Sequence, residues 1–436
     1  MKKSSAISIA KSMLALASER EVQLETELPK FTEDMLESSD EDDQDMEAPI
    51  LESIYMAEGN QGLMTMTNFS SEEFDALWNQ LRDHVLCNWN IGRGRKSKFS
   101  PKDVLLMLLS VLKRGEAWDV MAMSFGISPP SFEKLIMVFL NVVSEFCYEN
   151  FVEGVQEKWN MTRLSEKNRL FRNKPWALYA TDVRFQQSNR PSGNHAESKA
   201  WFSGKHKLYG LKTEVSVLPI GFAIDCTNMY KGSVSDKAIM QEGYEKHRYF
   251  TKKNPAEKAL DDQGEFLEHY PDQWAILVDK GYQGCLEGLR VIHPKRKPKG
   301  GYLTKEEKKA NVEISSDRIT VENFFGRLCQ LWGLMSKKYR WNLRSYDQFS
   351  RFAVSMTNFH ISKHPLRKED SHFHARVKAR MKEIAETSVK KRQMTQRAYR
   401  EKRKRRMSQK MYVPHLHLDD AIFGHGDDDE DLSFNE

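Results

Sequence analysis

Residues 176–182 read Trp-Ala-Leu-Tyr-Ala-Thr-Asp, and residues 274–279 read Trp-Ala-Ile-Leu-Val-Asp. Each is a nearly continuous apolar run of the length of a buried β-strand. Each run also closes on an aspartate, Asp182 in the first and Asp279 in the second. The two runs therefore predict buried strands with a carboxylate at the end of each.

The surrounding sequence has the same mixed character. Strand-like runs recur with glycine and proline turns between them, and helical periodicity follows later in the chain. Strands first and helices afterwards predict an α/β domain over residues 170–365, in which a sheet is layered with helices. The further strands are expected at 209–218 and 220–226, and the helices after Ser235 and from Ile319 onward.

A third carboxylate, Glu322, opens the helical stretch 321–328, Val-Glu-Asn-Phe-Phe-Gly-Arg-Leu. In the predicted sheet, Asp182 and Asp279 can lie side by side at one edge, with the Glu322 helix packed across that edge. Carboxylate oxygens suit Mg²⁺ or Mn²⁺, and two such ions about 4 Å apart hold the attacking and leaving oxygens of a phosphoryl displacement. The three acids thus predict a two-metal site that cuts or joins nucleic-acid strands.

Each acid alone also has a simpler interpretation. An aspartate at a strand end commonly caps a turn or a helix, and a lone glutamate on a helix is usually a solvated charge. The joint pattern favours the metal site, because Asp279 leads into the glycine-flanked turn 280–284 and Arg318 precedes Glu322 by one helical turn.

Length and composition indicate a protein of several folded parts. The chain has 436 residues, of which 39% are hydrophobic, enough for a substantial core. Its five cysteines are scattered without a C-x-x-C pair, which argues against a disulfide framework and a structural zinc site. No uninterrupted apolar run reaches membrane-spanning length, so we expect a reducing intracellular compartment and no membrane partner.

Charge is distributed unevenly along the chain. The net charge is +5, yet residues 1–50 carry 13 acidic and 5 basic groups. Residues 367–410 carry 17 basic and 5 acidic groups, and residues 411–436 are acidic again. We therefore expect disordered charged tails over 1–65 and 366–436, and a basic body and arm that bind a phosphate backbone.

Residues 66–150 are expected to form an all-helical domain. Within it, the stretch 117–125 reads as a short helix ended by Gly126, and Ser128 is placed to cap a second helix that starts at Pro129. This pattern is typical of a DNA-binding helix-turn-helix whose second helix enters a major groove, although an ordinary helical hairpin has the same signals.

Several basic and polar residues are candidates for DNA contact. Four lie in a strip before the helix-turn-helix, three at the start of its second helix, and six in loops expected near the acids. Any one of these lysines is more commonly a solvated surface charge. The three groups are Arg93, Arg95, Lys96 and Lys98; Ser128, Ser131 and Lys134; and Lys205, Lys207, Lys280, Lys295, Arg296 and Lys297.

Taken together, five segments resemble the catalytic domain of DDE superfamily endonucleases, most closely transposases of the Harbinger/PIF type. They are 179–182 (YATD), 202–212 (FSGKHKLYGLK), 232–236 (GSVSD), 277–282 (LVDKGY) and 318–326 (RITVENFFG). The resemblance covers about 170–360, and the segment 100–139 is similar to the helix-turn-helix that precedes this domain in such transposases.

The resemblance implies an RNase H-like catalytic domain with Asp182, Asp279 and Glu322 as catalytic and metal-binding triad, and two Mg²⁺ or Mn²⁺ ions as cofactors. It departs from the family pattern where Val183-Arg184 follows Asp182 and where Ser315-Ser316-Asp317 precedes Arg318. Asp225 and Asp236 are rival carboxylates, and for Asp236 we favour a structural role in capping the next helix.

The implied function is a transposase-like DNA endonuclease and strand transferase active in DNA recombination on element ends and target DNA. A homodimer and a Myb-like accessory protein are possible partners. The alternative is a domesticated, transposase-derived protein that binds DNA or chromatin without cutting; a nuclease acting on RNA is less favoured, because nothing resembles an RNA-binding module. The basic clusters 390–392 and 402–406 resemble a bipartite nuclear-import signal, so we expect a nuclear protein.

Overall fold

The structure is a computed structural model that describes residues 48–93, 96–192, 194–284, 288–298 and 300–366, together with Arg397. The chain divides into two units, Met1–His374 and Ala375–Glu436. All elements below belong to the first unit, so the expected helical domain and the expected α/β domain form one unit. Of the predicted charged tails, the structure describes only residues 48–65, Leu366 and Arg397. Both basic clusters of the predicted nuclear-import signal lie outside the described residues.

The described residues form a seven-stranded mixed sheet whose order is β2-β3-β1-β6-β7, with β4 and β5 also paired to β3. Strands β3 and β4 run antiparallel to their neighbours, whereas β6 lies parallel to β1 and β7 parallel to β6. The expected α/β class is therefore observed. The strands are β1 (Ala177–Gln187), β2 (Phe202–Ser203), β3 (Leu208–Val217), β4 (Ala223–Cys226), β5 (Tyr230–Lys231), β6 (Ala275–Leu277) and β7 (Val291–Ile292).

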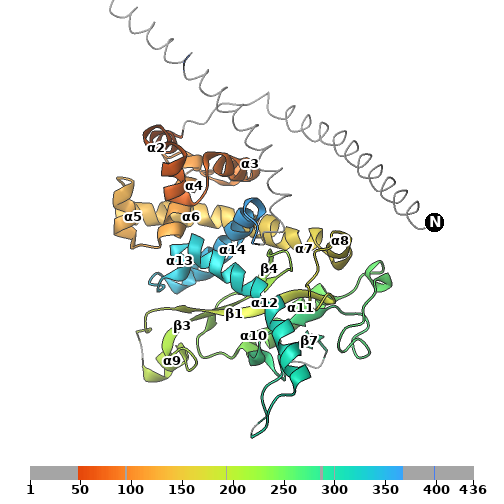
Figure 1. Ribbon diagram of the computed structural model, residues 1–436. Helices are drawn as coiled ribbons and strands as arrows, with labels where there is room; N and C mark the ends of the chain where they lie inside the picture. The colour runs from red at the N-terminus through yellow and green to blue at the C-terminus, as the bar shows by residue number, and fades with distance from the viewer. Residues whose placement is uncertain are drawn as a thin grey trace, which may run out of the picture. The chain divides into compact units, whose positions relative to one another are not determined.

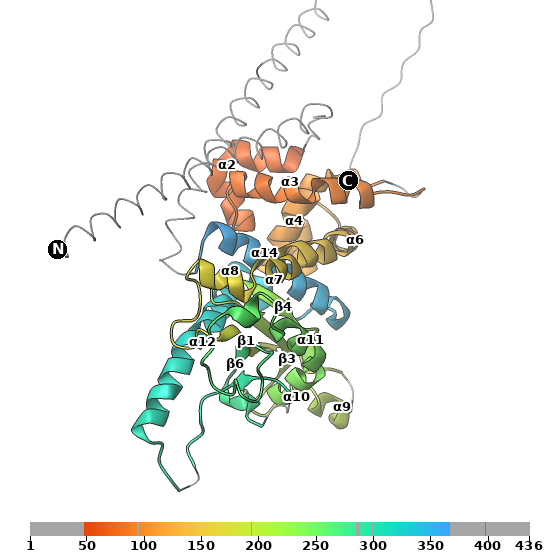
Figure 2. The ribbon, with the colours of Figure 1, turned by 90° about the vertical axis from the view of Figure 1, so that its right-hand side faces the viewer.

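Both faces of the sheet are buried, as continuous apolar runs predict. Along β6, Ala275 and Leu277 contribute to one core cluster, whereas Ile276 contributes to the other. The first cluster includes Val321 from α12 (Lys305–Leu331). Helix α12 therefore covers the Leu277 face of the sheet (Figures 1 and 2).

Helices precede the sheet and return after it. The long ones pack around the same core, and the short ones lie in the connections (Figure 1). Those not bounded elsewhere are α3 (Ser71–Asn88), α4 (Pro101–Arg114), α5 (Trp118–Ser124), α6 (Pro129–Tyr148), the π-helical turn η1 (Glu149–Glu153), α7 (Gly154–Lys158), α8 (Met161–Glu166), α9 (His195–Lys199), α10 (Asp236–Glu242), α11 (Tyr244–Thr251), η2 (Glu257–Ala259), η3 (Lys280–Tyr282), α13 (Gly333–Ser336), η4 (Leu343–Ser345) and α14 (Tyr346–Lys363).

The expectation of a disordered segment over 1–65 is wrong for its last part. Helix α2 (Pro49–Thr67) packs against α4, with Leu51 and Leu63 buried. The backbone N–H of Leu51 donates to the buried carboxylate of Asp103 at 2.9 Å. Sequence periodicity did not reveal this helix, because its backbone breaks at Gly59 and its apolar residues do not follow one face.

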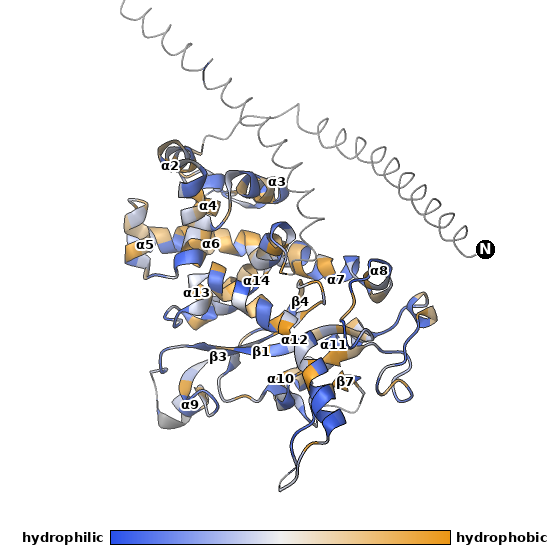
Figure 3. Cartoon of the chain, in the orientation of Figure 1, coloured by the Kyte–Doolittle hydropathy of each residue, from blue (hydrophilic) through white to orange (hydrophobic). Residues whose placement is uncertain are grey.

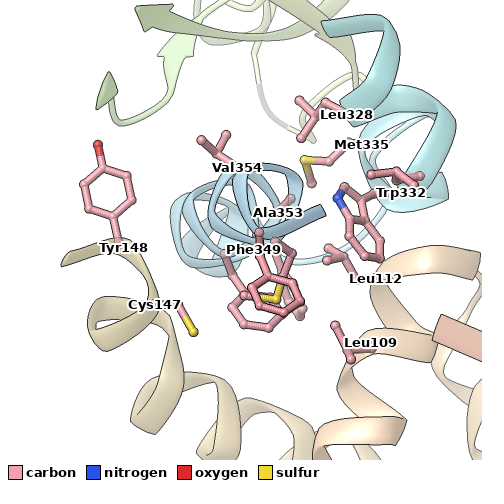
Figure 4. Close-up of a cluster of buried hydrophobic side chains, with 14 of the residues drawn as sticks. Leu109, Leu112, Cys147, Tyr148, Leu328, Trp332, Met335, Phe349, Ala353 and Val354 are labelled. Atoms are coloured by element: carbon pink, nitrogen blue, oxygen red, sulfur yellow. The ribbon is translucent and has the colours of Figure 1, made fainter. Parts of the chain in front are cut away.

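The N-terminal helices interlock with the C-terminal ones through two glycines. Gly115 ends α4 at φ 57°, and a Cβ there would lie 2.6 Å from the Leu334 backbone. A Cβ on Gly333 would lie 2.4 Å from the carbonyl oxygen of Lys113. Only glycine permits this close approach. Helix α14 packs in the same hydrophobic core, among residues of α4, α6, α12 and α13 (Figure 4).

Side chains from two helices also satisfy strand β4. Asn358 of α14 accepts from the Ala223 N–H at 2.9 Å and donates to the carbonyl of the same residue at 2.7 Å. The Tyr148 hydroxyl, at the end of α6, accepts from the Cys226 N–H at 2.8 Å. Because the free edge of β4 is covered in this way, the helices and the sheet form one structure.

Two element boundaries differ from the sequence predictions. Strand β1 continues to Gln187, so Asp182 lies within it; the residues beyond Asp182 pair with β3. Helix α12 starts at Lys305, well before Ile319. Its first turns are polar and project from the body, so no apolar stripe marks them (Figure 3). The capping box of Thr304 and Glu307 was the available signal.

One helical segment, Pro129–Lys158, is long and apolar enough to cross a membrane on length and composition alone. The sequence prediction concerned uninterrupted apolar runs, and this segment is interrupted by charged residues such as Glu133 and Lys134. Half of the apolar window is buried inside the protein. Phe132, Phe139 and Val143 pack in the shared core, as expected of a core helix.

Candidate active site

The sheet register places two of the three candidate acids side by side. Ala180 of β1 is paired with Leu277 of β6. Asp182 follows Ala180 by two residues, so it lies on the same face of β1, because side chains alternate along a strand. Asp279 follows Leu277 by two residues, just beyond the end of β6. Ala180, Leu277 and Val321 belong to one core cluster, so α12 brings Glu322 to the same place. The predicted proximity of the three acids is observed; their catalytic role stays a prediction.

The three carboxylates surround one guanidinium. Nη2 of Arg318 donates to Oδ2 of Asp182 at 2.8 Å, while Nη1 lies 3.5 Å from Asp279 Oδ1 and 4.0 Å from Glu322 Oε1. The Arg318 side chain is 6% exposed, whereas that of Glu322 is 58% exposed. A buried cation thus faces three acids, and the exposure of their side chains increases from Asp182 through Asp279 to Glu322.

The local charge also affects protonation of Asp182. Burial raises the pKa of this carboxyl to about 6, and the neighbouring Asp279 and Asp236 add to the rise. Arg318 and the Val183 N–H, which donates to Asp182 Oδ1 at 2.8 Å, oppose it. Additional positive charge at this edge of the sheet would therefore favour the ionised form of Asp182.

Asp279 is held in place by a buried chain of polar side chains. The turn η3 follows it, and the Tyr282 hydroxyl donates to Glu214 Oε2 at 2.9 Å. The other oxygen, Glu214 Oε1, pairs with His247 Nε2 at 3.0 Å, and His247 Nδ1 pairs with the Tyr179 hydroxyl at 2.8 Å. The Glu214–His247 pair is almost fully buried. This chain connects the turn after Asp279 to β3, α11 and β1.

The rival carboxylates have different surroundings. Asp225 is buried and accepts from Lys246 at 2.5 Å and from the Tyr148 hydroxyl at 3.0 Å, which gives it a structural role. Asp236 lies beside the site: it accepts from Lys212 at 2.9 Å, and its Oδ2 would be 3.1 Å from a Cβ on Gly281.

The predicted capping role of Asp236 is wrong. The cap of α10 is the Ser235 hydroxyl, which accepts from the Ala238 N–H at 3.1 Å. Asp236 is the first residue of the helix and pairs with Lys212 instead. Glycine at 281 allows the Asp236 carboxylate to approach the turn that follows Asp279.

Asp317 fixes α12 against the entrance to β1. Its Oδ2 accepts from the backbone N–H groups of Asn173 and Lys174 at 3.0 and 2.8 Å, and its Oδ1 accepts from the Asn173 amide at 3.0 Å. The buried Lys174 in turn pairs with Glu265. Asp317 therefore sets where Arg318 and Glu322 lie relative to β1.

The sequence departs from the family pattern at Val183-Arg184 and at Ser315-Ser316-Asp317, and in both places a side chain makes packing contacts. Arg184 is buried, donating to the Met335 carbonyl and, at 3.2 Å, to Gln186. It thereby connects β1 to α13. At the second departure, Asp317 binds the loop before β1 through Asn173 and Lys174.

The candidate DNA-contact residues are exposed wherever they are described. Arg95 lies outside the described residues, while Lys96 bonds the Asn90 carbonyl and Lys98 lies over the Phe99 ring. Exposure is shared by Arg93, Lys96 and Lys98; Ser128, Ser131 and Lys134; and Lys205, Lys207, Lys280, Lys295, Arg296 and Lys297.

The predicted pair of helices separated by a glycine turn is observed. Helix α5 is followed by Gly126 at φ 62° and then by α6. The Ser128 hydroxyl donates to Ser131 at 2.8 Å and makes no cap bond to the backbone, which corrects its predicted capping contact. Closer to the acids, Arg296 donates to the Lys280 carbonyl at 2.7 Å, which connects the basic loop to the turn after Asp279.

Sequence reasoning missed Glu214, His247 and Asp317 as residues that support the site. Each acts through contacts between segments far apart in the chain. The predicted strand at 209–218 was the available signal for Glu214. Strand β3 is buried from Gly210 onward, which makes the position internal without naming its partners.

Within the described ranges, no group of three or more His, Cys, Asp or Glu side chains is close enough to hold a metal ion as it stands. The donor chemistry nevertheless fits a hard cation, because three carboxylates face one positive group. Asp182, Asp279 and Glu322 are the residues that would hold it.

Residues 178–358 match the family described as DDE superfamily endonuclease. Together with the relative described next, this match supports a DDE transposase-like protein, and the resemblance seen in the sequence is confirmed at this level. It is also similar to a probable transposase for insertion sequence element IS702 from Microchaete diplosiphon, with 23% identity over 270 residues, 62% of this chain and 84% of that protein. No solved structure matches the chain.

Proposed function

We propose that this protein is a DNA endonuclease and strand transferase that cuts phosphodiester bonds with a two-metal-ion mechanism, and that it is of the Harbinger/PIF type. The observation that carries the proposal is the convergence of three acids within 4.0 Å of one guanidinium: Asp182 from β1, Asp279 from the turn after β6, and Glu322 from α12. A transposase-like relative and the endonuclease family support the reaction class.

The proposed fold of the catalytic domain is RNase H-like. Its support is a sheet in which β1, β3 and β4 form an antiparallel set and β6 and β7 extend from β1 in parallel. In this arrangement the first strand and the first parallel strand are neighbours, so the acids they carry meet at one edge. The acid-bearing helix then crosses that edge.

Two Mg²⁺ or Mn²⁺ ions, when bound, would activate a water or a strand 3′-hydroxyl and neutralise the leaving oxygen. Asp182, Asp279 and Glu322 would hold them. Tyr282 and Glu214 keep the Asp279 turn in position, and Asp317 keeps α12 against β1. These contacts are buried, so the acids remain in register when DNA replaces water above them.

DNA is the proposed substrate and partner. Helices α5 and α6 are proposed as a DNA-binding helix-turn-helix that recognises element ends, with Ser131 and Lys134 on the exposed start of α6. The Lys295–Lys297 loop is proposed to hold the backbone near the acids. A nuclear location, a Myb-like accessory protein and a homodimer complete the proposal and rest on the sequence resemblance and the tail composition.

The test is cleavage of a supercoiled plasmid that carries the genomic sequence flanking the coding region, with Mg²⁺, Mn²⁺ or EDTA. We expect metal-dependent nicking by the wild type and no nicking by Asp182→Ala, Asp279→Ala or Glu322→Ala, while each variant still binds the DNA and folds. Asp261→Ala, an exposed aspartate on the loop before β6, is the matched control and should nick normally.

Two results would change the conclusion. Nicking retained by Asp279→Ala would remove that residue from the catalytic triad. Tight DNA binding by the wild type without nicking in any metal would favour the alternative, a transposase-derived DNA-binding or chromatin protein.

A further inference from the structure

Arg318 is a buried arginine with few bonds. Its side chain is 6% exposed, yet among the described residues only the 2.8 Å contact of Nη2 with Asp182 has the length of a hydrogen bond. The contacts with Asp279 and Glu322, at 3.5 and 4.0 Å, are electrostatic. Its buried Nε has no hydrogen-bond partner in the described part of the chain.

Arg290 shows how the same fold treats an arginine with a structural role. Its fully buried guanidinium donates to both oxygens of Asp262 at 2.6 and 3.0 Å. Its Nε donates to the Glu265 carbonyl at 2.8 Å, and Nη1 donates to the Gln273 carbonyl at 3.1 Å. Buried guanidinium groups that support a fold have their donors satisfied in this way. Arg318 therefore differs in kind from Arg290.

We propose that the Arg318 guanidinium is the counter-ion of the acid triad in the metal-free protein and competes with the divalent cation for it. The inference rests on the proposed function, since it takes Asp182, Asp279 and Glu322 to be the metal ligands. Binding of a divalent ion then requires the guanidinium to leave its central position, and Arg318 sets the metal affinity as a positioning residue.

Electrostatics gives the reason. Three carboxylates held around one point repel one another, and a single positive charge at 2.8–4.0 Å relieves that repulsion. A divalent cation relieves it better, but it has to displace the charge already present. The missing partner of Nε and the two long contacts mean that few hydrogen bonds are lost when the guanidinium moves.

The first test compares Mn²⁺ binding by wild type and Arg318→Gln, using isothermal titration calorimetry on the full chain without DNA. Removing the competing charge should tighten Mn²⁺ binding by about tenfold or more. Lys309→Gln removes the same charge from an exposed position on α12 and should bind Mn²⁺ as the wild type does. Equal or weaker binding by Arg318→Gln would overturn the proposal.

A second measurement uses only the wild type, so it remains decisive if Arg318→Gln does not fold. Phenylglyoxal modifies accessible arginines, and mass spectrometry locates the products. Arg318 should be protected without metal and become modified when Ca²⁺ or Mn²⁺ is added, whereas Arg290 should stay protected in both conditions. Protection of Arg318 that persists with saturating metal would contradict displacement.

Failure of this inference is distinguishable from failure of the proposed function. If Mn²⁺ binding is lost in Asp279→Asn but unchanged in Arg318→Gln, the metal site stands and the competition does not. If Mn²⁺ binding does not depend on Asp279 at all, the acids are not the metal site, and both conclusions fall.

Discussion

Replacing Tyr282 by phenylalanine removes one oxygen atom from the buried chain behind the acids. The Tyr282 hydroxyl donates to Glu214 Oε2 at 2.9 Å, and burial together with this carboxylate raises the pKa of the tyrosine well above its ordinary value. The Glu214 side chain is 1% exposed, so water cannot replace the lost donor. The variant leaves a buried carboxylate oxygen without this partner.

The expected cost follows from that loss. A hydrogen bond to a charged group contributes roughly 1.5–3 kcal/mol, and leaving a buried charged acceptor unsatisfied adds to it, so Tyr282→Phe should destabilise by about 2–4 kcal/mol. Total stabilities are of the order of 5–15 kcal/mol, so this loss is readily measured. The assay is urea unfolding, in which the midpoint should fall while the slope stays the same.

The matched control is Tyr249→Phe, because Tyr249 lies on α11 with 72% of its surface exposed. It should change stability by less than about 0.5 kcal/mol. Because the same contact holds the Asp279 turn, Tyr282→Phe should also slow plasmid nicking without weakening DNA binding. A Tyr282→Phe protein as stable as the Tyr249→Phe control would refute the view that this chain supports the turn.

Two further predictions concern other parts of the protein. Burial opposes ionisation of Asp262, but the Arg290 and Lys253 hydrogen bonds outweigh it and lower its pKa to about 2. At pH values above the ordinary aspartate pKa, the ionised carboxylate therefore stabilises the fold by about 2 kcal/mol, and this stabilisation is lost as pH falls towards 2. In urea unfolding, the difference in stability between wild type and Asp262→Asn should narrow from pH 4 to pH 2. A difference that stays constant over this range would contradict the reasoning. In the α5–α6 pair, Lys134→Gln should weaken DNA binding and reduce its salt dependence by about one released ion. Lys158→Gln, at the far end of the same helical segment, should change neither. Equal effects of the two substitutions would argue against α6 as the DNA-reading helix.

Local signals in the sequence predicted the elements that depend on local interactions. The predicted helices on either side of Gly126 are observed, as are the strands predicted at 209–218 and 220–226. The strand interpretation also predicted that Asp182 and Asp279 would lie together, since neighbouring parallel strands end at one edge. These features need only periodicity, caps and the geometry of a sheet.

The remaining features depend on contacts that periodicity does not encode. The first half of α12 is polar because it projects, and α2 is kinked at Gly59, so neither carries an apolar stripe. Arg318 was noted only as a neighbour of Glu322 on the helix. That its guanidinium lies among three acids follows from the packing of α12 on β1 and β6, which no local pattern specifies.

The candidate site illustrates how repelling charges can be held together by a stable fold. The β1–β6 register places Asp182 beside Asp279, the Tyr282–Glu214 contact holds the turn, and Asp317 holds α12. None of these three features uses the carboxylates of the triad. The contacts that hold the three acids in place therefore do not depend on the acids themselves. The acids are then free to be matched to a cation, and their mutual repulsion becomes a reason to bind one. In the metal-free protein that cation is Arg318, and the fold can tolerate its departure because the acids are positioned without it.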